Sequence, residues 1–495
     1  MRIKTKARKA GILLFWLIVW QLAAIIMENE ILLVGPVEVF LRLISDGMTV
    51  PFWNTVIHSL FRIITGFLGA FALGSLFGIL AYRYSLLQEL LEPLMSAVKS
   101  VPVASFVVIL LIWFGAERLS IWVAFLIVLP NLYFQVLEGL HATDRKLLEM
   151  GKVYGVSAWN RAWYIYRPAL RPFLMSGCKV SVGMAWKSGV AAEIIGLPAQ
   201  SVGERIYMSK IYLDTAGVLS WTVVCIILSF LVEKIFLSML ARGLTFRIPM
   251  WNRGQRTGWE SETQDEDRSR IGNRAQSEYK NRIGNEAENE YKSRIGSEHQ
   301  NIKNRDIIIE NLTKSYGSNL VLQGENFTLE SGKIYAFMNP SGTGKTTLLR
   351  ILAGLESFDS GSITGLPQKV GMIFQENTCI QSLDALGNME LICGPKEEKE
   401  WERLLREVGL SEIGRKTMGQ FSGGMVRRVE ILRCLLSDRE LLLMDEPFNG
   451  LDEENRRIVI DMIHKYQRNR TIVMTTHKIE EAREMKAEIG TMYAP

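Results

Sequence analysis

The chain contains 495 residues, which exceeds one ordinary domain and corresponds to about three units of roughly 150 residues each. Its formal net charge is only +5, and its basic residues are scattered or flank apolar stretches, so the composition does not indicate nucleic-acid binding. The five cysteines show no CxxC spacing, which favours a reduced, cytoplasm-facing protein without disulfides or a metal site.

Six apolar stretches in the first half predict an all-α polytopic membrane domain over residues 1–250, because a bilayer core of about 30 Å needs roughly 20 apolar residues in a helix. Five of the first ten residues are Lys or Arg, which places the N-terminus in the cytoplasm, and no small-residue cleavage site follows. Six crossings return the chain to the cytoplasmic side. The stretches lie near 10–27, 57–82, 97–115, 119–138, 173–196 and 216–240, and Lys99 and Pro102 interrupt the start of the third.

Ionisable groups inside membrane spans are costly and often functional, and the candidates here are Arg62, Lys179, Lys187 and Glu193. Lys179 and Lys187 share one helical face with Gly183 between them, so they could line a polar path that favours an anion. Alternatively, Lys179 extends to the membrane interface, and Lys187 pairs with Glu193 or a backbone carbonyl. The interfacial interpretation is favoured for Lys179, and both remain open for Lys187. Lys187, Glu193 and Arg62 are the candidates for a substrate path.

A long basic connection, about 139–172, follows the fourth stretch and is expected in the cytoplasm. It contains Glu149-Met150-Gly151, then Gly155, then Ile165-Tyr166-Arg167-Pro168. This pattern resembles the EAA loop of importer permeases, although Met-Gly replaces Ala-Ala and Arg167 stands where Leu is usual.

The resemblance implies that a short amphipathic helix, roughly Lys146 to Ser157, ends at Gly155 and docks into a groove on an ATPase. Glu149 and Gly155 are then the coupling residues. The alternative is an ordinary cytoplasmic loop with a chance Glu and Gly. Further along, MAWKSGVAAEIIGLPAQSVGERIY resembles permeases for sulfonates, nitrate, taurine and related small molecules, including thiamine-precursor pyrimidines.

A polar bridge runs from Trp251 to about Arg305 and carries an imperfect twelve-residue repeat: SRIGNRAQSEYK, NRIGNEAENEYK and SRIGSEHQNIKN. Each unit has a single Ile and cannot bury a core. Residues 251–305 are therefore predicted to be a disordered linker.

The last part, residues 306–495, begins with two predicted strands, Asp306 to Leu312 and Gly332 to Phe337, and the second leads into NPSGTGKTT and an evident helix. Strand, loop and helix in this order form the context of a phosphate-binding loop, whose backbone N–H groups and helix N-terminus cradle phosphates. Asn339 replaces the first glycine of the motif and is expected to tolerate a left-handed backbone. The predicted nucleotide-binding residues are Asn339, Pro340, Ser341, Gly342, Thr343, Gly344, Lys345, Thr346 and Thr347. Lys345 should reach the β and γ phosphates, and Thr346 should ligate Mg²⁺.

FSGGM at Phe421–Met425 lies between this loop and the strand LLLMDE, which ends at Glu446. The arrangement resembles the nucleotide-binding domain of an ATP-binding cassette (ABC) protein, an α/β P-loop NTPase. Asp445, at the strand end, is placed to hold Mg²⁺ through water, and Glu446 to act as general base. The resemblance further implies that Gln375 contacts Mg²⁺ and the attacking water, that His477 contacts the γ phosphate, and that Tyr316 stacks on adenine. A partly buried strand-end tyrosine is the alternative for Tyr316.

The resemblance also implies that Ser422, Gly423, Gly424 and Asp452 face the ATP held by a second subunit. One permease and one cassette per chain then predict a homodimer that uses ATP and Mg²⁺, in the bacterial cytoplasmic membrane with the ATPase domain in the cytoplasm. The predicted function is import of a small anionic or polar solute that a separate extracytoplasmic binding protein delivers. A half-size exporter and a non-transporting signalling ATPase are the alternatives, although no predicted external segment exceeds about thirty residues, which argues against the latter.

Overall fold

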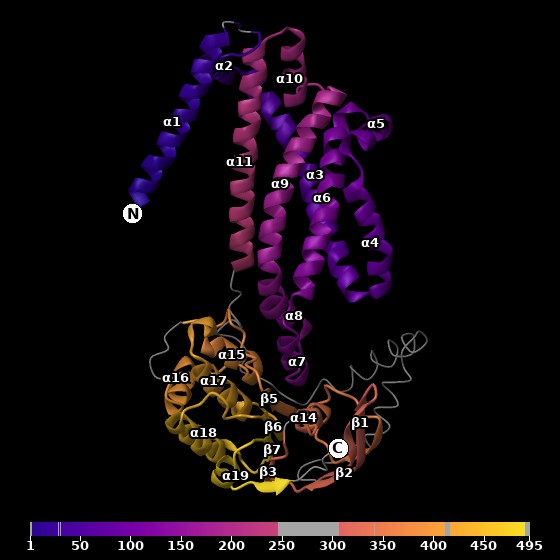
Figure 1. Ribbon diagram of the computed structural model, residues 1–495, viewed down its shortest axis with the longest axis vertical. Coiled ribbons are helices and arrows are strands. Elements are labelled where there is room, and N and C mark those ends of the chain that lie inside the picture. Colours follow the sequence, from indigo (N-terminus) through magenta and orange to yellow (C-terminus); the bar gives the residue numbers. More distant parts are fainter. Residues whose placement is uncertain are drawn as a thin grey trace, which may run out of the picture. The chain divides into compact units, whose positions relative to one another are not determined.

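The computed structural model describes residues 2–27, 29, 31–245, 306–340, 342–410 and 416–490, and the chain divides into two compact units (Figure 1). The first unit comprises Met1–Thr143 and Tyr166–Phe246, and the second comprises Asp144–Ile165 and Arg247–Pro495. The predicted linker, residues 251–305 with its repeats, lies outside the described residues.

Every element described in the first unit is a helix, in agreement with the predicted fold class. Helices α3 and α6 approach closely because α3 carries small residues at the contact: a Cβ added to Gly66 would lie 2.3 Å from the carbonyl oxygen of Ile121. The helices are α1 (Arg2–Met27), α2 (Pro36–Gly47), α3 (Val50–Arg83), α4 (Ser85–Ser100), α5 (Val103–Phe114), α6 (Ala116–His141), α9 (Arg167–Gly196), α10 (Val202–Ile211) and α11 (Thr215–Thr245).

Three described helices are long and apolar enough to cross a membrane, namely α3, α6 and α11. Helices α4 and α5 would make a fourth span if the bent pair counts as one, since they meet at 102°. The interruption that the sequence places at Lys99 and Pro102 is observed: Pro102 lacks an N–H and disfavours helical geometry at Val101, so the helix breaks there and the stretch near 97–115 is not one straight helix. The total of six spans and the orientation stay predictions.

The second unit contains two sheets. One is antiparallel with strand order β2-β1-β4, and the other is parallel with order β5-β6-β7-β3-β8. The strands are β1 (Ile307–Tyr316), β2 (Asn319–Leu329), β3 (Ile334–Phe337), β4 (Ser360–Thr364), β5 (Val370–Ile373), β6 (Leu441–Asp445), β7 (Thr471–Thr475) and β8 (Glu488–Gly490). Because the carboxyl ends of parallel strands share one edge, the loops after β3, β5, β6 and β7 meet there.

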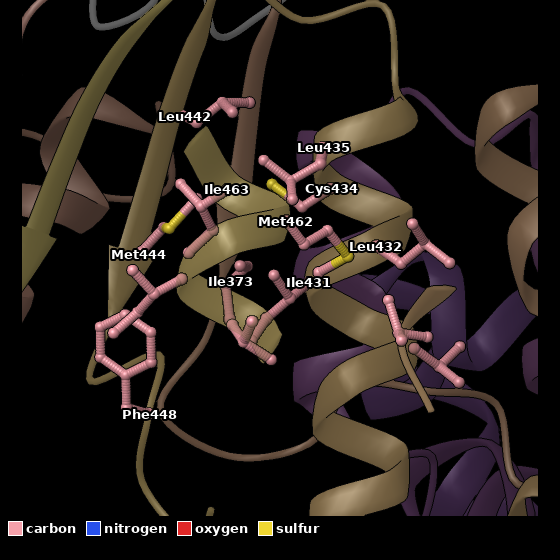
Figure 2. Close-up of a cluster of buried hydrophobic side chains, with 14 of the residues drawn as sticks. Ile373, Ile431, Leu432, Cys434, Leu435, Leu442, Met444, Phe448, Met462 and Ile463 are labelled. Carbon is pink, nitrogen blue, oxygen red and sulfur yellow. The ribbon is translucent and has the colours of Figure 1, made fainter. Parts of the chain in front are cut away.

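Helices cover the parallel sheet and supply its core. Buried side chains of α17 (Gly423–Leu436) and α18 (Glu453–Tyr466) form one apolar cluster with β5 and β6 (Figure 2). This packing holds the start of α17 in a fixed place relative to the end of β6. The labelled members are Ile373, Ile431, Leu432, Cys434, Leu435, Leu442, Met444, Phe448, Met462 and Ile463. The other helices of this unit are α7 (Arg145–Val153), α8 (Ala158–Arg161), α14 (Lys345–Leu352), α15 (Ala385–Cys393), α16 (Glu398–Glu407) and α19 (Ile479–Glu484), with a π-helical turn, Ala162–Tyr166, that ends at the unit boundary and a 3₁₀ turn, Met418–Gln420.

Candidate ATP site and coupling segment

The phosphate loop joins β3 to α14 as the sequence predicts. Gly342 and Gly344 have φ of +88° and +86°, and a Cβ at Gly344 would lie 2.7 Å from the Leu322 side chain, so glycine is required there. Asn339 does not have a positive φ, which corrects the expectation of a left-handed backbone at that position. Left-handed geometry falls on the two later glycines instead. Ser341 lies outside the described residues.

Lys345 is the first residue of α14, and its side chain is buried against the loop. Its ammonium donates hydrogen bonds to the carbonyl oxygens of Asn339 and, at 2.8 Å, of Pro340. Burial lowers the pKa of Lys345, while the carboxylates of Glu446 and Asp445 oppose this effect. A phosphate bound at this loop would favour the charged form of Lys345. Thr346 is exposed, and Thr347 is half-buried.

Asp445 and Glu446 follow one another at the end of β6, and Thr475 at the end of β7 fixes both. The Thr475 hydroxyl donates to Asp445 Oδ1 at 2.7 Å and accepts from the Glu446 N–H at 3.0 Å. Glu446 has φ of +45°, an uncommon left-handed backbone for a side chain of this kind. His477 Nε2 lies 3.2 Å from Glu446 Oε1. The structure therefore brings together Asp445, Glu446 and His477, and it adds Thr475, which the sequence analysis missed.

Two further candidates lie at strand ends. Gln375 is exposed and lies two residues after the end of β5. Ile373 of β5 pairs with Met444 of β6, so Gln375 follows the strand that neighbours the one ending at Asp445. Tyr316 ends β1 with 46% of its surface exposed, and Lys314 Nζ lies 5.0 Å from the centre of its ring. The Tyr316 ring is thus accessible to a ligand, as stacking on adenine requires.

The FSGGM motif forms the N-terminus of α17. Ser422 is the N-cap, and its hydroxyl accepts from the Met425 N–H at 3.3 Å. Ser422 and Gly423 are exposed and Gly424 is half-buried, so the helix presents N–H groups and the positive end of its dipole to the surface. Asp452 caps α18 in the same way by accepting from the Asn455 N–H at 2.8 Å.

Residues Asp144–Ile165, here called the coupling segment, belong to the same compact unit as the ATPase fold. Helix α7 begins after its N-cap Asp144 and ends at Val153, because Gly155 has φ of +62°. The observed helix is therefore shorter than the predicted one, which ran roughly from Lys146 to Ser157. Ser157 instead caps α8 by accepting from the Asn160 N–H at 3.2 Å.

Glu149 joins this segment to α14 through paired hydrogen bonds. Its carboxylate accepts hydrogen bonds from both terminal nitrogens of Arg350 on α14, at 2.8 and 2.9 Å, and lies 3.3 Å from Arg145 Nε. Two parallel charge-assisted bonds of this kind fix geometry as well as adding energy. The Arg350 guanidinium holds the pKa of Glu149 below its usual 4.5.

Tyr154 is a second anchor that the sequence analysis missed. Its hydroxyl donates to the Met372 carbonyl oxygen at 3.1 Å, and its own carbonyl accepts from Arg439 at 2.7 Å. The ring is 4% exposed. An aromatic residue directly before Gly155 in a basic loop is the only sequence signal, and nothing in it identifies the partners. Lys146 adds an ion pair with Glu376.

The Glu149–Arg350 pair predicts a pH-dependent stability. A carboxylate whose pKa is lowered by folding contributes stability above its unfolded pKa, and this contribution is lost as the pH falls through the lowered folded value. We expect Glu149→Gln to lower the Tm of the intact chain at pH 7, and the difference from wild type to shrink below about pH 4. Glu453→Gln is the control, because Glu453 forms an exposed pair with Arg457 and should change the Tm little at either pH. An equal Tm difference at both pH values would contradict the prediction.

The candidates for a substrate path separate into two groups. Glu193 is fully buried and accepts from Ser59 Oγ at 2.8 Å and from the Gly203 N–H at 3.2 Å, while Arg62 pairs with Glu117. These contacts give Glu193 and Arg62 structural partners that join α3, α6, α9 and the start of α10. Lys187 is exposed on α9 and has no ion pair with Glu193 in the described part of the chain. Lys179 is exposed on the same helix.

A phosphate loop between a parallel strand and a helix, with paired acidic residues at the end of a neighbouring strand, defines a P-loop nucleoside triphosphatase. Residues 322–449 match the family described as "ABC transporter", and residues 70–248 match the "Binding-protein-dependent transport system inner membrane component". The chain belongs to the ABC transporter family, as an importer-type permease fused to an ATPase cassette. It is a membrane protein that binds ATP and couples ATP hydrolysis to transport.

Similar proteins include separate cassettes of several transporters. The lantibiotic transport ATP-binding protein SrtF of Streptococcus pyogenes is 34% identical over 196 residues, covering 37% of this chain and 86% of SrtF. The aliphatic sulfonates import ATP-binding protein SsuB 1 of Pseudomonas syringae pv. syringae is 36% identical over 180 residues, covering 36% of this chain and 75% of that protein. The sulfate/thiosulfate import ATP-binding protein CysA of Neisseria meningitidis serogroup B is 35% identical, covering 38% and 58% respectively.

Proposed function

We propose that the chain is the transporting subunit of an ATP-driven importer in a bacterial cytoplasmic membrane, with its N-terminus and cassette in the cytoplasm. The observation that carries the proposal is the order of the two matched segments in one polypeptide: a binding-protein-dependent permease at 70–248 and an ABC ATPase at 322–449. The paired contact between Glu149 and Arg350 supports the coupling segment as the connection between them. The functional regions are a permease over 1–250, a linker over 251–305 and a cassette over 306–495.

In this proposal the cassette residues bind and orient ATP. Lys345 holds the β and γ phosphates, Tyr316 stacks on adenine, and the loop from Asn339 to Thr347 surrounds the phosphates with N–H groups. Glu446 accepts a proton from the attacking water as general base, and His477 contacts the γ phosphate.

Mg²⁺ fits the oxygen donors that this site presents. The Thr346 hydroxyl is exposed at the start of α14, the Asp445 carboxylate is fixed by Thr475, and Gln375 follows the adjacent strand. Hard oxygen donors are the ligands that Mg²⁺ prefers, and when bound it neutralises charge on the transferred phosphoryl group. The chain's own contribution is to hold these three donors at one edge of the sheet.

A homodimer supplies the rest of the site. Ser422, Gly423 and Gly424 present a helix N-terminus at the surface, and Asp452 lies at the start of α18, so these residues can contact ATP bound to a second copy. Two chains then provide two permease domains, two cassettes and two shared sites.

The cargo we propose is a small anionic or polar solute of the sulfonate, nitrate or taurine type, or a thiamine precursor, delivered by a separate extracytoplasmic binding protein. The sulfonate and sulfate import cassettes among the similar proteins support an anionic cargo, as does the exposed Lys187 on α9. Export is the second candidate, since one similar cassette is named for lantibiotic transport.

Uptake of labelled solutes by a deletion strain tests both candidates. We expect the wild-type chain to restore accumulation of one sulfonate, sulfate-like anion, nitrate or thiamine precursor, and Glu446→Gln to restore none. The Glu453→Gln chain, changed at an exposed position, serves as the matched control and should restore uptake. Normal accumulation of every solute in the deletion strain, together with increased sensitivity to an antimicrobial peptide, would contradict import and favour export.

A further inference from the structure

Arg427 lies on α17 and is not among the residues proposed to contact ATP. Its side chain nevertheless contacts the backbone that follows β6, at Asp445–Pro447. Its side chain is buried and donates to the carbonyl oxygens of Asp445 at 2.9 Å, Glu446 at 2.7 Å and Pro447 at 3.0 Å. A fourth bond of 2.5 Å goes to the carbonyl of Phe374, the residue before Gln375. One guanidinium therefore ties the FSGGM helix to the segments that carry the general base and Gln375.

Glu430, one turn further along α17, continues this contact network. Its Oε2 lies 3.4 Å from Arg427, and its Oε1 accepts from both the N–H and the hydroxyl of Thr378. Arg427, Glu430 and Thr378 are all buried. Removing one partner of a buried ion pair leaves the other charge uncompensated, which is costly. The Arg427–Glu430 pair is therefore expected to keep both side chains in place.

Arg433 extends the network to the coupling segment. It donates to the Thr378 hydroxyl at 3.1 Å and to the Thr378 carbonyl at 3.4 Å, and its guanidinium carbon lies 5.7 Å from the centre of the Tyr154 ring. Arg439 lies 5.5 Å from the same ring and bonds the Tyr154 carbonyl. Each guanidinium group lies within the range of about 6 Å over which a cation is attracted to an aromatic ring.

We propose that Arg427 is a positioning residue for ATP hydrolysis, and that the buried contacts Arg427–Glu430–Thr378–Arg433 transmit the docking of Tyr154 to the backbone of Glu446. The link to Tyr154 rests on the proposed function of the coupling segment. Glu446 holds an uncommon left-handed backbone, so the carbonyl bonds from Arg427 restrain a conformation that the chain would otherwise leave.

The first test is Arg427→Lys in the intact chain, reconstituted in lipid nanodiscs. A lysine keeps the charge but has no planar fork, so it cannot bond the carbonyl oxygens of both segments, Asp445–Pro447 and Phe374. We expect kcat for ATP hydrolysis to fall by about tenfold or more, with the KM for ATP within about twofold of wild type, because a displaced base affects the chemical step. Glu430→Gln is the second variant and should lower kcat in the same direction.

Arg470→Lys is the matched control, since Arg470 also donates to backbone carbonyls, of Leu435, Tyr466, Gln467, Ser437 and Arg439, and none of these carries the base. It should lower the Tm without lowering kcat per folded molecule. An unchanged kcat in folded Arg427→Lys, with only the Tm reduced, would overturn the positioning role.

The second test is a double-mutant cycle between Tyr154→Leu and Arg427→Lys, read in kcat. If the contacts transmit docking, the two losses are not additive, and the double variant is at least about threefold more active than the product of the single effects. Additive losses would overturn the link while leaving Arg427 as a positioning residue. Wild-type and Glu446→Gln chains are measured alongside. If wild type hydrolyses ATP, Glu446→Gln does not, and wild type takes up no solute, the importer proposal fails while the positioning role of Arg427 stands.

Discussion

Replacing Glu446 by Gln will lower kcat for ATP hydrolysis by about 10²- to 10⁴-fold while ATP still binds, because general-base catalysis contributes a factor of that size. Gln keeps the size of the side chain and can keep a hydrogen bond with His477, which lies 3.2 Å from Glu446 Oε1. It cannot take the proton of the attacking water. The variant should therefore trap ATP.

The measurement is single-turnover hydrolysis beside equilibrium binding of ATP by the intact chain. Glu453→Gln, which changes an exposed carboxylate on α18, should keep wild-type kcat. Hydrolysis at the wild-type rate in Glu446→Gln would remove Glu446 as the base. Loss of ATP binding as well would show that the Glu446 side chain also maintains the loop around Lys345. The Glu446 carboxylate favours the charged form of the Lys345 ammonium.

The sequence predicted the parts of the site whose signal lies within a short window. The strand, glycine loop and helix around Lys345 are contiguous, and Asp445 and Glu446 follow an apolar strand directly, so pattern and chemistry coincide. Parallel pairing of β6 with β7 then brings His477 to the same edge.

Contacts between distant segments could not be predicted in this way. Tyr154 and Arg439 are 285 positions apart, and no pattern in either segment identifies the other. Arg427 looks like one more basic residue in a helix, and its role depends on carbonyl groups whose direction only the folded backbone sets. Thr475 was missed for the same reason.

Backbone details were the other source of error. The sequence indicated an interruption at Pro102, but it did not predict that α4 and α5 meet there at 102°. At Asn339 the family pattern suggested a left-handed residue, but the loop turns at Gly342 and Gly344. In both cases the controlling quantity is a local dihedral preference, which composition averages away.

Glu149→Arg will uncouple transport from ATP hydrolysis while ATP binding stays close to wild type. The substitution removes two charge-assisted bonds to Arg350 and places a second cation beside it. Hydrogen bonds to charged groups contribute about 1.5–3 kcal/mol each, so loss of this contact should lower solute uptake per ATP hydrolysed by about tenfold or more. Lys345, the proposed phosphate ligand, is five residues away on α14 and keeps its own contacts with the loop.

The decisive comparison is the charge-reversed pair Glu149→Arg with Arg350→Glu. Exchanging the two charges restores an ion pair between the same positions, although the forked geometry is reversed, so uptake should recover by several-fold over either single variant. Arg145→Glu is the control, because Arg145 contacts the same carboxylate at 3.3 Å but is almost fully exposed, and screening makes such a contact weak. Full transport by Glu149→Arg would end the assignment of this residue to coupling. If both single variants fail and the double variant does not recover, Glu149 and Arg350 act independently, and the route from permease to cassette depends on the Tyr154 anchor instead.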